Sequence, residues 1–246
     1  MEFKIQKLIS QSGFCSRRKA EELILQNRVF VNGKLATIGQ KASFNDEIKI
    51  DNKILKKASF LYYAFYKPKR VVCTREDNFD RKKIIDFFPK EEYLYTIGRL
   101  DYNTTGIILL TNDGDLANKL MHPKFEIQRT YLVHTNNDLT DVQISFLNKN
   151  KIKLNNGIDS LQKVEKKGTK KYIVKLKQGS NHHVKRLFDY FNIEVLGLKR
   201  LEFAGITLAN LEVGQYRKLN IKEIKFSKSL ATISLKNEGK RRKLTK

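Results

Sequence analysis

Residues 98–114 have the sequence GRLDYNTTGIILLTNDG, a polar turn followed by an apolar run and a second polar turn. The apolar run from Gly106 to Leu110 is typical of a buried strand, and the polar residues on either side of it are typical of turns. The turn before the run brings together an Arg, a carboxylate and two hydroxyl groups. Enzymes hold a reactive group still by placing it beside a rigid element. Asp101 is therefore the first candidate for a catalytic residue.

The composition of the whole chain points to a polyanionic partner. The 246 residues, 40% of them hydrophobic, suffice for one large core and a small additional domain. The chain carries 49 Lys and Arg against 26 Asp and Glu, a net charge of +23, which favours nucleic acid as the partner. A compositionally biased genome is the alternative source of the lysines, but the cations also form local clusters. The apolar runs are too short to span a bilayer, so no membrane partner is expected.

Neither a metal site nor a secretion signal is indicated. The two cysteines, Cys15 and Cys73, have no paired spacing, which argues against a disulfide framework and a zinc site. The adjacent His182 and His183 would diverge by about 100° on a helix, so they are not expected to share a metal ion. Residues 1–7 lack the apolar core of a signal peptide, and we therefore expect a cytoplasmic protein.

The first fifty residues predict a compact helix-helix-hairpin unit. Apolar positions between Phe3 and Ile9 indicate a short first helix, and Ser16 is placed to cap a second one. A short apolar strand then meets Asn32-Gly33, the dipeptide that best tolerates the two positive φ angles of a tight hairpin. We expect a small domain over residues 1–50.

A basic cluster marks the start of the predicted second helix. Arg17, Arg18 and Lys19 fall in its first turn, where like charges repel one another and oppose the helix dipole. This unfavourable placement is easiest to understand if an RNA backbone neutralises the cluster, with Lys34 nearby for the same purpose. The alternative is a solvated basic face. We predict that these four residues bind RNA phosphates.

The rest of the chain predicts a second, larger domain of the α+β class. Residues 51–59 are polar and rich in Lys and are interpreted as a linker. Residues 60–228 alternate strand-like and helical patterns without a repeated βαβ period, which favours a mixed, mostly antiparallel sheet with flanking helices. Residues 229–246 form a basic C-terminal tail that we expect to be disordered when alone and attracted to phosphate.

One later helix carries further cations. A strand is predicted over residues 172–177, after which one residue of the pair Ser180-Asn181 is placed to cap a helix. The buried stripe of this helix includes Val184, and Lys185 and Arg186 flank the stripe.

These features resemble a known family over nearly the whole chain. Residues 13–21 and 29–34 together resemble the S-four-type RNA-binding domain, named after a ribosomal protein. The larger domain resembles the bacterial ribosomal RNA pseudouridine synthases that carry such a domain. The motifs that carry this second resemblance, in chain order, are Lys67–Val72, Gly98–Asp101 with Thr104 and Gly106, Thr111–Gly114, His122-Pro123 and Arg129–Tyr131.

The resemblance implies that the chain isomerises a specific uridine of ribosomal RNA to pseudouridine. The base is flipped out of its helix into a pocket with aromatic and apolar walls. Asp101 then attacks the anomeric carbon or takes a proton from the neighbouring sugar carbon, so that the glycosidic bond breaks. The uracil rotates and is rejoined through carbon five. No cofactor and no metal are implied, and large-subunit RNA is favoured over small-subunit RNA.

The resemblance also assigns roles to other positions. Arg99 would enter the gap left by the flipped base or orient the backbone, and Tyr131 would stack on the uracil. Lys185 matches the family's basic residue that pairs with Asp101 and keeps it ionised. The remaining implied residues are Val184 and Leu198 in the pocket wall and Arg186 among the RNA contacts.

The chain departs from these relatives in the predicted helix. His182 and His183 stand where the family usually has Arg-Gln, and Lys185 stands where it has Arg, which would pair with a carboxylate as a point charge. Taken singly, Asp101 fits a turn former, Tyr131 a core aromatic and Lys185 a solvated helix residue. The ordered motif set favours the enzyme.

A second function stays open. In this alternative, the chain has the same fold but no catalytic activity, and it acts as an RNA-binding ribosome assembly factor. The altered His182-His183 segment suggests this alternative. The sequence leaves open which uridine is modified and whether the partner is free ribosomal RNA or a pre-ribosomal particle. A monomer is the default expectation.

Overall fold

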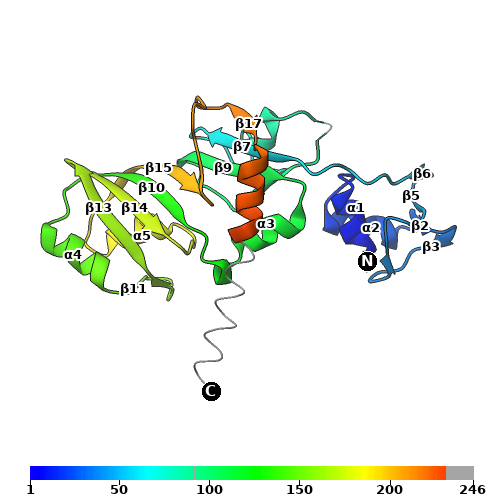
Figure 1. Ribbon diagram of the computed structural model, residues 1–246, viewed down its shortest axis with the longest axis horizontal. Helices are drawn as coiled ribbons and strands as arrows, with labels where there is room; N and C mark the ends of the chain where they lie inside the picture. Colours follow the sequence, from blue (N-terminus) through cyan, green and yellow to red (C-terminus); the bar gives the residue numbers. More distant parts are fainter. Residues whose placement is uncertain (91, 231–246) are drawn as a thin grey trace, which may run out of the picture.

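The computed structural model describes residues 1–90 and 92–230, which fold into two bodies (Figure 1). The smaller, N-terminal body lies at one end of the molecule, and an extended segment connects it to the larger body. The predicted basic tail, residues 229–246, falls mostly outside the described residues. Its first two positions belong to a helical segment, residues 221–230.

The N-terminal domain is the expected helix-helix-hairpin unit. Ser16 caps the second helix as predicted, because its Oγ accepts a hydrogen bond from Lys19 N at 3.1 Å. Asn32 and Gly33 close the hairpin with φ angles of 49° and 78°. The elements of this domain, in chain order, are β1 (Phe3–Lys4), α1 (Ile5–Gln11), α2 (Arg17–Leu25), β2 (Val29–Val31), β3 (Lys34–Leu35), β4 (Lys41–Ala42), β5 (Ile48–Ile50) and β6 (Lys53–Ile54).

The sheet of this domain continues past residue 50. Its strand order is β3-β2-β5-β6, and β6 lies within residues 51–59, the segment interpreted as a linker. Leu55 N also donates a hydrogen bond to Ile48 O at 2.7 Å. The chain therefore stays attached to the N-terminal domain as far as residue 55, and the free connection to the larger domain is short.

The larger domain is built on a nine-stranded sheet. The strand order is β13-β14-β10-β15-β9-β7-β17, with β8 paired to β9 and β16 paired to β15. Every pairing is antiparallel except that of β15 with β9. The expected mixed, mostly antiparallel α+β architecture is therefore confirmed. The strands are β7 (Tyr62–Lys67), β8 (Tyr95–Ile97), β9 (Thr105–Thr111), β10 (Arg129–Thr135), β13 (Gln162–Gly168), β14 (Lys171–Leu176), β15 (Val195–Phe203), β16 (Ile206–Thr207) and β17 (Tyr216–Lys218), beside a separate pair of β11 (Ile152–Lys153) and β12 (Asp159–Ser160).

Helices cover both faces of this sheet, so the domain has two apolar cores. On one face α4, α5 and η1 pack against β10, β14 and part of β7, and on the other face α3 and the helical segment 221–230 pack against β9. Within the described residues, no helix is both long and apolar enough to cross a membrane. The helices are α3 (Gly114–Met121), α4 (Asp141–Lys149) and α5 (His183–Asp189), with the 3-10 turns η1 (Ile84–Phe87) and η2 (Pro123–Phe125).

The parallel pairing of β15 with β9 brings the Asp101 turn to the centre of the sheet. Gly106 at the start of β9 pairs with Arg200 of β15, and Tyr131 of β10 pairs with Arg200 from the other side. A Cβ on Gly106 would lie 2.2 Å from Arg200 O, and its φ of +116° is one that other residues rarely adopt. Only glycine therefore allows the two strands to approach so closely.

The predicted cap of α5 is wrong. His182, not Ser180 or Asn181, is the N-cap residue, with a φ of 53° and no side-chain hydrogen bond to the helix. The Ser180 hydroxyl instead contacts Nδ1 of His183 at 3.1 Å. Because this ring is buried and needs polar partners, it takes the hydroxyl that would otherwise cap the helix.

Candidate active site

A buried lysine fixes the turn that carries Asp101. Lys67 is the last residue of β7 and is fully buried. Its Nζ donates hydrogen bonds to the carbonyl oxygens of Pro68 at 3.0 Å, Asp101 at 3.1 Å, Tyr102 at 3.4 Å and Thr104 at 3.0 Å. Burial lowers the pKa of Lys67 to about 8. One side chain thus gathers the main-chain carbonyls around Asp101 into a fixed loop.

Main-chain contacts hold the same turn from the side of residues 70–73. Arg70 N donates to Tyr102 O at 2.8 Å, and Thr104 N donates to Asp101 O at 3.0 Å. The Cys73 thiol donates to Leu100 O at 3.3 Å and accepts from Leu100 N at 3.4 Å. The backbone on either side of Asp101 is therefore constrained, which is what a positioned reactive group requires.

Asp101 lines a cavity of about 270 Å³. The cavity lies between the turn, β10, the strand ends around β15 and the start of α5. It includes five of the residues predicted from the sequence, namely Arg99, Asp101, Tyr131, Val184 and Leu198. The other lining residues are Ile97, Gly98, Leu100, Thr104, Met121, Arg129, Leu176, Gly179, Ser180, Asn181, His182, His183, Arg200 and Phe203.

The carboxylate of Asp101 remains accessible in this cavity. Its side chain is 33% exposed, and Nε2 of His182 lies 3.8 Å from Oδ1. A half-exposed imidazole at this distance can ion-pair with the carboxylate only when the ring is protonated. Tyr131, in contrast, is only 8% exposed, because it belongs to the core as well as to the cavity wall.

The structure does not bring Lys185 to Asp101. Among the residues that the structure describes, Lys185 forms no ion pair with this carboxylate and does not line the cavity. Val184 faces the core and cavity, and successive residues of a helix point about 100° apart, so Lys185 points elsewhere. Arg186 donates to Asn181 O at 2.8 Å, which ties the end of α5 to the preceding loop. The pairing of Lys185 with Asp101 stays a prediction.

The other predicted RNA-binding residues lie on the N-terminal domain. Arg17, Arg18, Lys19 and Lys34 are all exposed, the first three at the start of α2. Lys19 pairs with Glu22 at 2.8 Å within the helix. An exposed pair of this kind contributes little to stability and leaves the ammonium group available to exchange partners.

Two arginines, the buried Arg200 and the half-buried Arg129, line the cavity without having been assigned a role from the sequence. Arg129 and Arg200 both contact the Phe203 ring, with guanidinium carbons 5.2 Å and 4.8 Å from its centroid. Arg129 donates to the carbonyls of Ile127 and Lys177, and Arg200 Nε donates to Ile107 O at 2.8 Å.

The second nitrogen group of Arg200 distinguishes it from Arg129. Within the described residues, Nη2 of Arg200 is buried and has no hydrogen-bond partner. In the sequence, Arg200 is an Arg within the largely apolar strand β15. Such a pattern does not distinguish a buried arginine from one that points to solvent. Both arginines make the cavity positive, a potential that favours an anionic ligand.

His183 is neutral and structural. Its Nε2 lies 2.7 Å from Ser160 Oγ, and its ring is only 5% exposed. Burial, followed by the charges of Arg129 and Arg186, lowers the pKa of His183 to about 4. His182 instead faces Asp101, so the two rings diverge. Within the described residues, no three His, Cys, Asp or Glu side chains are gathered as metal ligands.

The cavity suits a ligand that combines a planar ring with phosphate groups, held within reach of the Asp101 carboxylate. A fixed, accessible carboxylate stands at the wall of a positive cavity whose other walls are Tyr131, Leu198 and Val184. An apolar and aromatic wall accepts a planar ring, and the cations accept phosphates attached to it.

Comparison with known proteins matches both parts of the chain. The profile of the RNA pseudouridylate synthase family matches residues 61–190, and the profile of the S4 domain matches residues 3–48. The ribosomal large subunit pseudouridine synthase B of Bacillus subtilis (strain 168) is 38% identical over 236 residues, which cover 93% of this chain and 96% of that protein.

Other relatives and a solved structure agree. The dual-specificity RNA pseudouridine synthase RluF of Salmonella typhi is 33% identical over 224 residues, which cover 90% of this chain and 77% of that protein. A crystal structure of a pseudouridylate synthase superimposes with a TM-score of 0.68 and 28% identity, over 92% of this chain and 99% of the other.

Proposed function

This chain belongs to the RNA pseudouridylate synthase family, and from that premise we propose that it isomerises a uridine of large-subunit ribosomal RNA to pseudouridine at Asp101. The observation that carries the proposal is the position of the Asp101 carboxylate, held by Lys67 and open to a cavity of about 270 Å³. A cavity of this size lies at the small end of ligand sites, which suits a single nucleoside.

The reaction needs only groups that the chain supplies. Asp101 attacks the anomeric carbon or removes a proton from the neighbouring sugar carbon, and the bond between the sugar and uracil N1 breaks. The freed uracil rotates, and its carbon five forms the new bond to the sugar. N1 gains one proton and carbon five loses one, so the atoms balance without an oxidant, a reductant or a co-reactant. A fixed carboxylate of this kind accelerates such a step through nucleophilic or general base catalysis.

The cavity walls supply the other roles. Tyr131, Val184 and Leu198 form the apolar surface against which the flipped uracil packs, a contact worth roughly 1 to 3 kcal/mol per stacked base. Arg99 is exposed at the mouth and is placed to fill the gap in the RNA helix or to hold its backbone. Arg129 and Arg200 favour the phosphates of the flipped nucleotide.

The choice of large-subunit RNA follows from a relative. The Bacillus subtilis protein that covers 93% of this chain is named for the large ribosomal subunit. The N-terminal S4 domain, with Arg17, Arg18, Lys19 and Lys34 exposed, supplies affinity for that RNA. We place the reaction in the cytoplasm, where ribosomal RNA is made and assembled in bacteria.

The test replaces the carboxylate without changing its size. Asp101→Asn should lower pseudouridine formation on unmodified large-subunit ribosomal RNA by about 10³-fold or more, while RNA binding persists. Asp189→Asn, at the exposed end of α5, is the matched control and should retain wild-type activity. Pseudouridines are mapped chemically after incubation with each purified protein.

Two outcomes would overturn the proposal. Wild-type turnover by the Asp101→Asn variant would remove Asp101 from the chemistry. Tight RNA binding by the wild type with no modified base would favour the alternative, a ribosome assembly factor that kept the fold without the reaction.

A further inference from the structure

Residues 73–83 form a loop whose base is closed beside the active-site turn. Val72 N donates to Lys82 O at 3.0 Å, and Ile84 N donates to Val72 O at 2.9 Å, so the two ends of the loop are joined. Next to this closure, the Cys73 thiol contacts the backbone of Leu100, the residue before Asp101. The loop therefore rises from the edge of the site already described.

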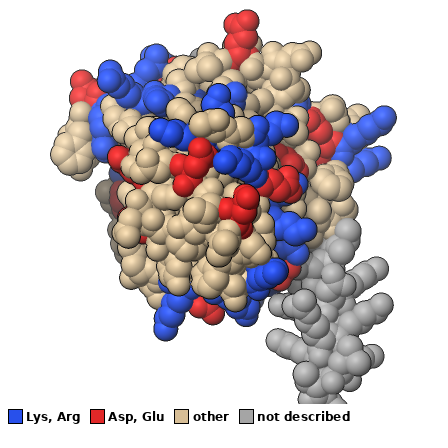
Figure 2. All heavy atoms as spheres, turned by 90° about the vertical axis from the view of Figure 1, so that its left-hand side faces the viewer, with Lys and Arg blue, Asp and Glu red and all other residues tan. Residues whose placement is uncertain are grey.

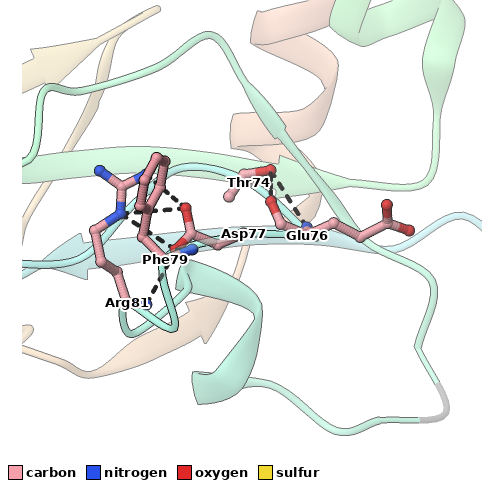
Figure 3. Close-up of polar contacts among 5 residues, drawn as sticks. All are labelled: Thr74, Glu76, Asp77, Phe79 and Arg81. Carbon is pink, nitrogen blue, oxygen red and sulfur yellow. Dashed lines mark hydrogen bonds and ion pairs between the residues drawn. The ribbon is translucent and has the colours of Figure 1, made fainter.

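The tip of this loop is clamped by one carboxylate (Figure 3). Asp77 accepts hydrogen bonds from Phe79 N at 3.1 Å and Arg81 N at 3.0 Å, and its Oδ1 pairs with Arg81 Nη2 at 2.6 Å. The Asp77 side chain is only 5% exposed. Thr74 adds a second tight turn, because its Oγ1 donates to Glu76 O at 2.7 Å. The tip is thus a rigid structure and not a loose surface loop.

This rigid tip presents Phe79 to solvent. The Phe79 ring is 77% exposed, and the guanidinium carbon of Arg81 lies 4.9 Å from the ring centroid. A single exposed aromatic residue is ordinary on protein surfaces. Here, however, two hydrogen bonds from backbone N–H groups to Asp77 fix the chain around the ring, so less conformational entropy is lost when a partner binds to it.

The chain that leads into the loop contacts the turn of Asp101. Lys67 donates hydrogen bonds to the carbonyls of Asp101 and Tyr102, and the Cys73 thiol contacts Leu100. Tyr102 directly follows Asp101, and Arg70 N donates to its carbonyl at 2.8 Å. The cations Lys69, Arg70 and Arg99 are all exposed around this turn.

The surroundings of Phe79 identify the kind of partner. Its neighbours along the tip are charged, namely Asp77, Asp80, Arg81 and Lys82, so an apolar protein groove could cover the ring only by desolvating these charges. A nucleobase offers a flat π-face to the ring, and its phosphates meet the cations around it.

We propose that Phe79 stacks on an unpaired base of the substrate RNA that flanks the flipped uridine, with Arg81 supporting the ring from its other side. This inference rests on the proposed function, since it takes the substrate to be RNA. The contact would hold the RNA strand next to the cavity while the target nucleotide is out of its helix.

The experiment uses the full chain and unmodified large-subunit ribosomal RNA transcribed in vitro. Phe79→Ala and Phe79→Leu should each bind this RNA about tenfold more weakly, because neither side chain has a π-face. Phe79→Trp should keep wild-type affinity. Position 79 is exposed, so all three variants should unfold at the wild-type temperature, and thermal unfolding checks directly for a folding defect.

The tryptophan variant also reports the contact itself. The chain has no Trp, so the residue introduced at position 79 is a unique fluorophore, and stacking on a base should quench its emission when RNA binds. Val142→Trp is the control, because Val142 is 78% exposed on the first turn of α4, a helix that lies at the end of the larger domain away from the N-terminal domain (Figure 1). Its emission should not change.

The outcomes separate this inference from the proposed function. Three outcomes would overturn the stacking contact only. They are wild-type RNA affinity in Phe79→Ala, wild-type affinity in Phe79→Leu but not in Phe79→Ala, and equal quenching of the tryptophans at positions 79 and 142. Pseudouridine formation by the wild-type protein on the same transcript is measured in parallel. Its absence, with the Phe79 effects intact, would overturn the chemistry and keep the contact, whereas no binding of RNA at all would overturn both.

Discussion

At the scale of single residues, the two adjacent histidines at the start of α5, the N-cap His182 and the first helical residue His183, have different roles. His182 lies 3.8 Å from Asp101 and is half exposed, whereas His183 is held between the hydroxyls of Ser160 and Ser180. Two like charges, Arg129 and Arg186, act on the buried ring in addition to its desolvation. A neutral His183 therefore stabilises the fold, and a protonated one would be a buried charge beside two cations.

This difference predicts a pH-dependent stability. The pKa of His183 falls from an ordinary value of 6.5 to about 4 in the folded chain, so between these values only the unfolded chain binds the proton. Stability contributed by the neutral ring is thus lost as the pH falls through this window. From about pH 7.5 to about pH 5, the free energy of unfolding should drop by about 2 kcal/mol more in the wild type than in His183→Gln. Urea unfolding at each pH measures it, and His134→Gln, at an exposed position, should behave as the wild type.

The sequence could predict the identity of several site residues but not their contacts. Asp101 and Tyr131 stood in ordered motifs and Leu198 matched an apolar pocket position of the family, and the structure gathers all three around one cavity. The role of Lys67 could not be predicted, because it depends on four carbonyl groups from residues 68 to 104 meeting at one point. The resemblance implied an ion pair between Lys185 and Asp101, yet the direction of a helical side chain depends on how the helix α5 is rotated against the sheet.

At the scale of elements, the parallel pairing of β9 with β15 determines where the site forms. It joins the strand that follows Asp101 to the strand that pairs with Tyr131. The close approach leaves no room for a side chain at Gly106. Gly197, also on the larger sheet, provides a contrast, because a Cβ there would lie 3.4 Å from His134 Cβ, in ordinary contact.

The contrast gives a matched pair of substitutions. Gly106→Ala should lower the free energy of unfolding by about 3 kcal/mol or more, since it combines a backbone overlap with a disfavoured φ. Gly197→Ala should change it by less than about 1 kcal/mol. Denaturant unfolding of both variants measures the difference. An equally small loss in the two would mean that the strands can separate at Gly106 without cost.

Elements were predictable where their signal is local. The Ser16 cap and the Asn32-Gly33 turn are confirmed because each is decided by a few neighbouring residues. The cap of α5 was wrong because Ser180 is drawn to His183, whose burial depends on strands distant in the sequence. β6 was missed because a two-residue strand in a lysine-rich segment has no periodic pattern to recognise.

At the scale of the whole molecule, the two domains touch through polar contacts. Lys7 and Gln11 of α1 contact Asp115 of α3, the former at 2.8 Å, and the Arg17 side chain lies near Tyr95 of the larger domain. An exposed ion pair of this kind contributes less than about 1 kcal/mol. The basic start of α2 therefore lies at the junction of the domains, so RNA that meets it also reaches the larger domain.

The opposite end of the molecule offers a control for net charge. There α4, β11 and β13 carry cations interspersed with acidic residues (Figures 1 and 2). Lys149, Lys151 and Lys153 are exposed at this end. Replacing these three lysines removes as many positive charges as replacing the cluster on α2, but it leaves the junction between the domains unchanged.

The two triple variants decide where the RNA backbone lies. Changing Arg17, Arg18 and Lys19 to Ala should weaken binding of ribosomal RNA and make the slope of log Kd against log salt concentration shallower by about 2, because fewer counterions are released. Changing Lys149, Lys151 and Lys153 to Ala should leave the slope within about 0.5 of the wild-type value, since a mixed surface collects few phosphates. Filter binding across a salt series measures both slopes. Equal changes in the two variants would mean that overall charge, and not the start of α2, attracts the RNA.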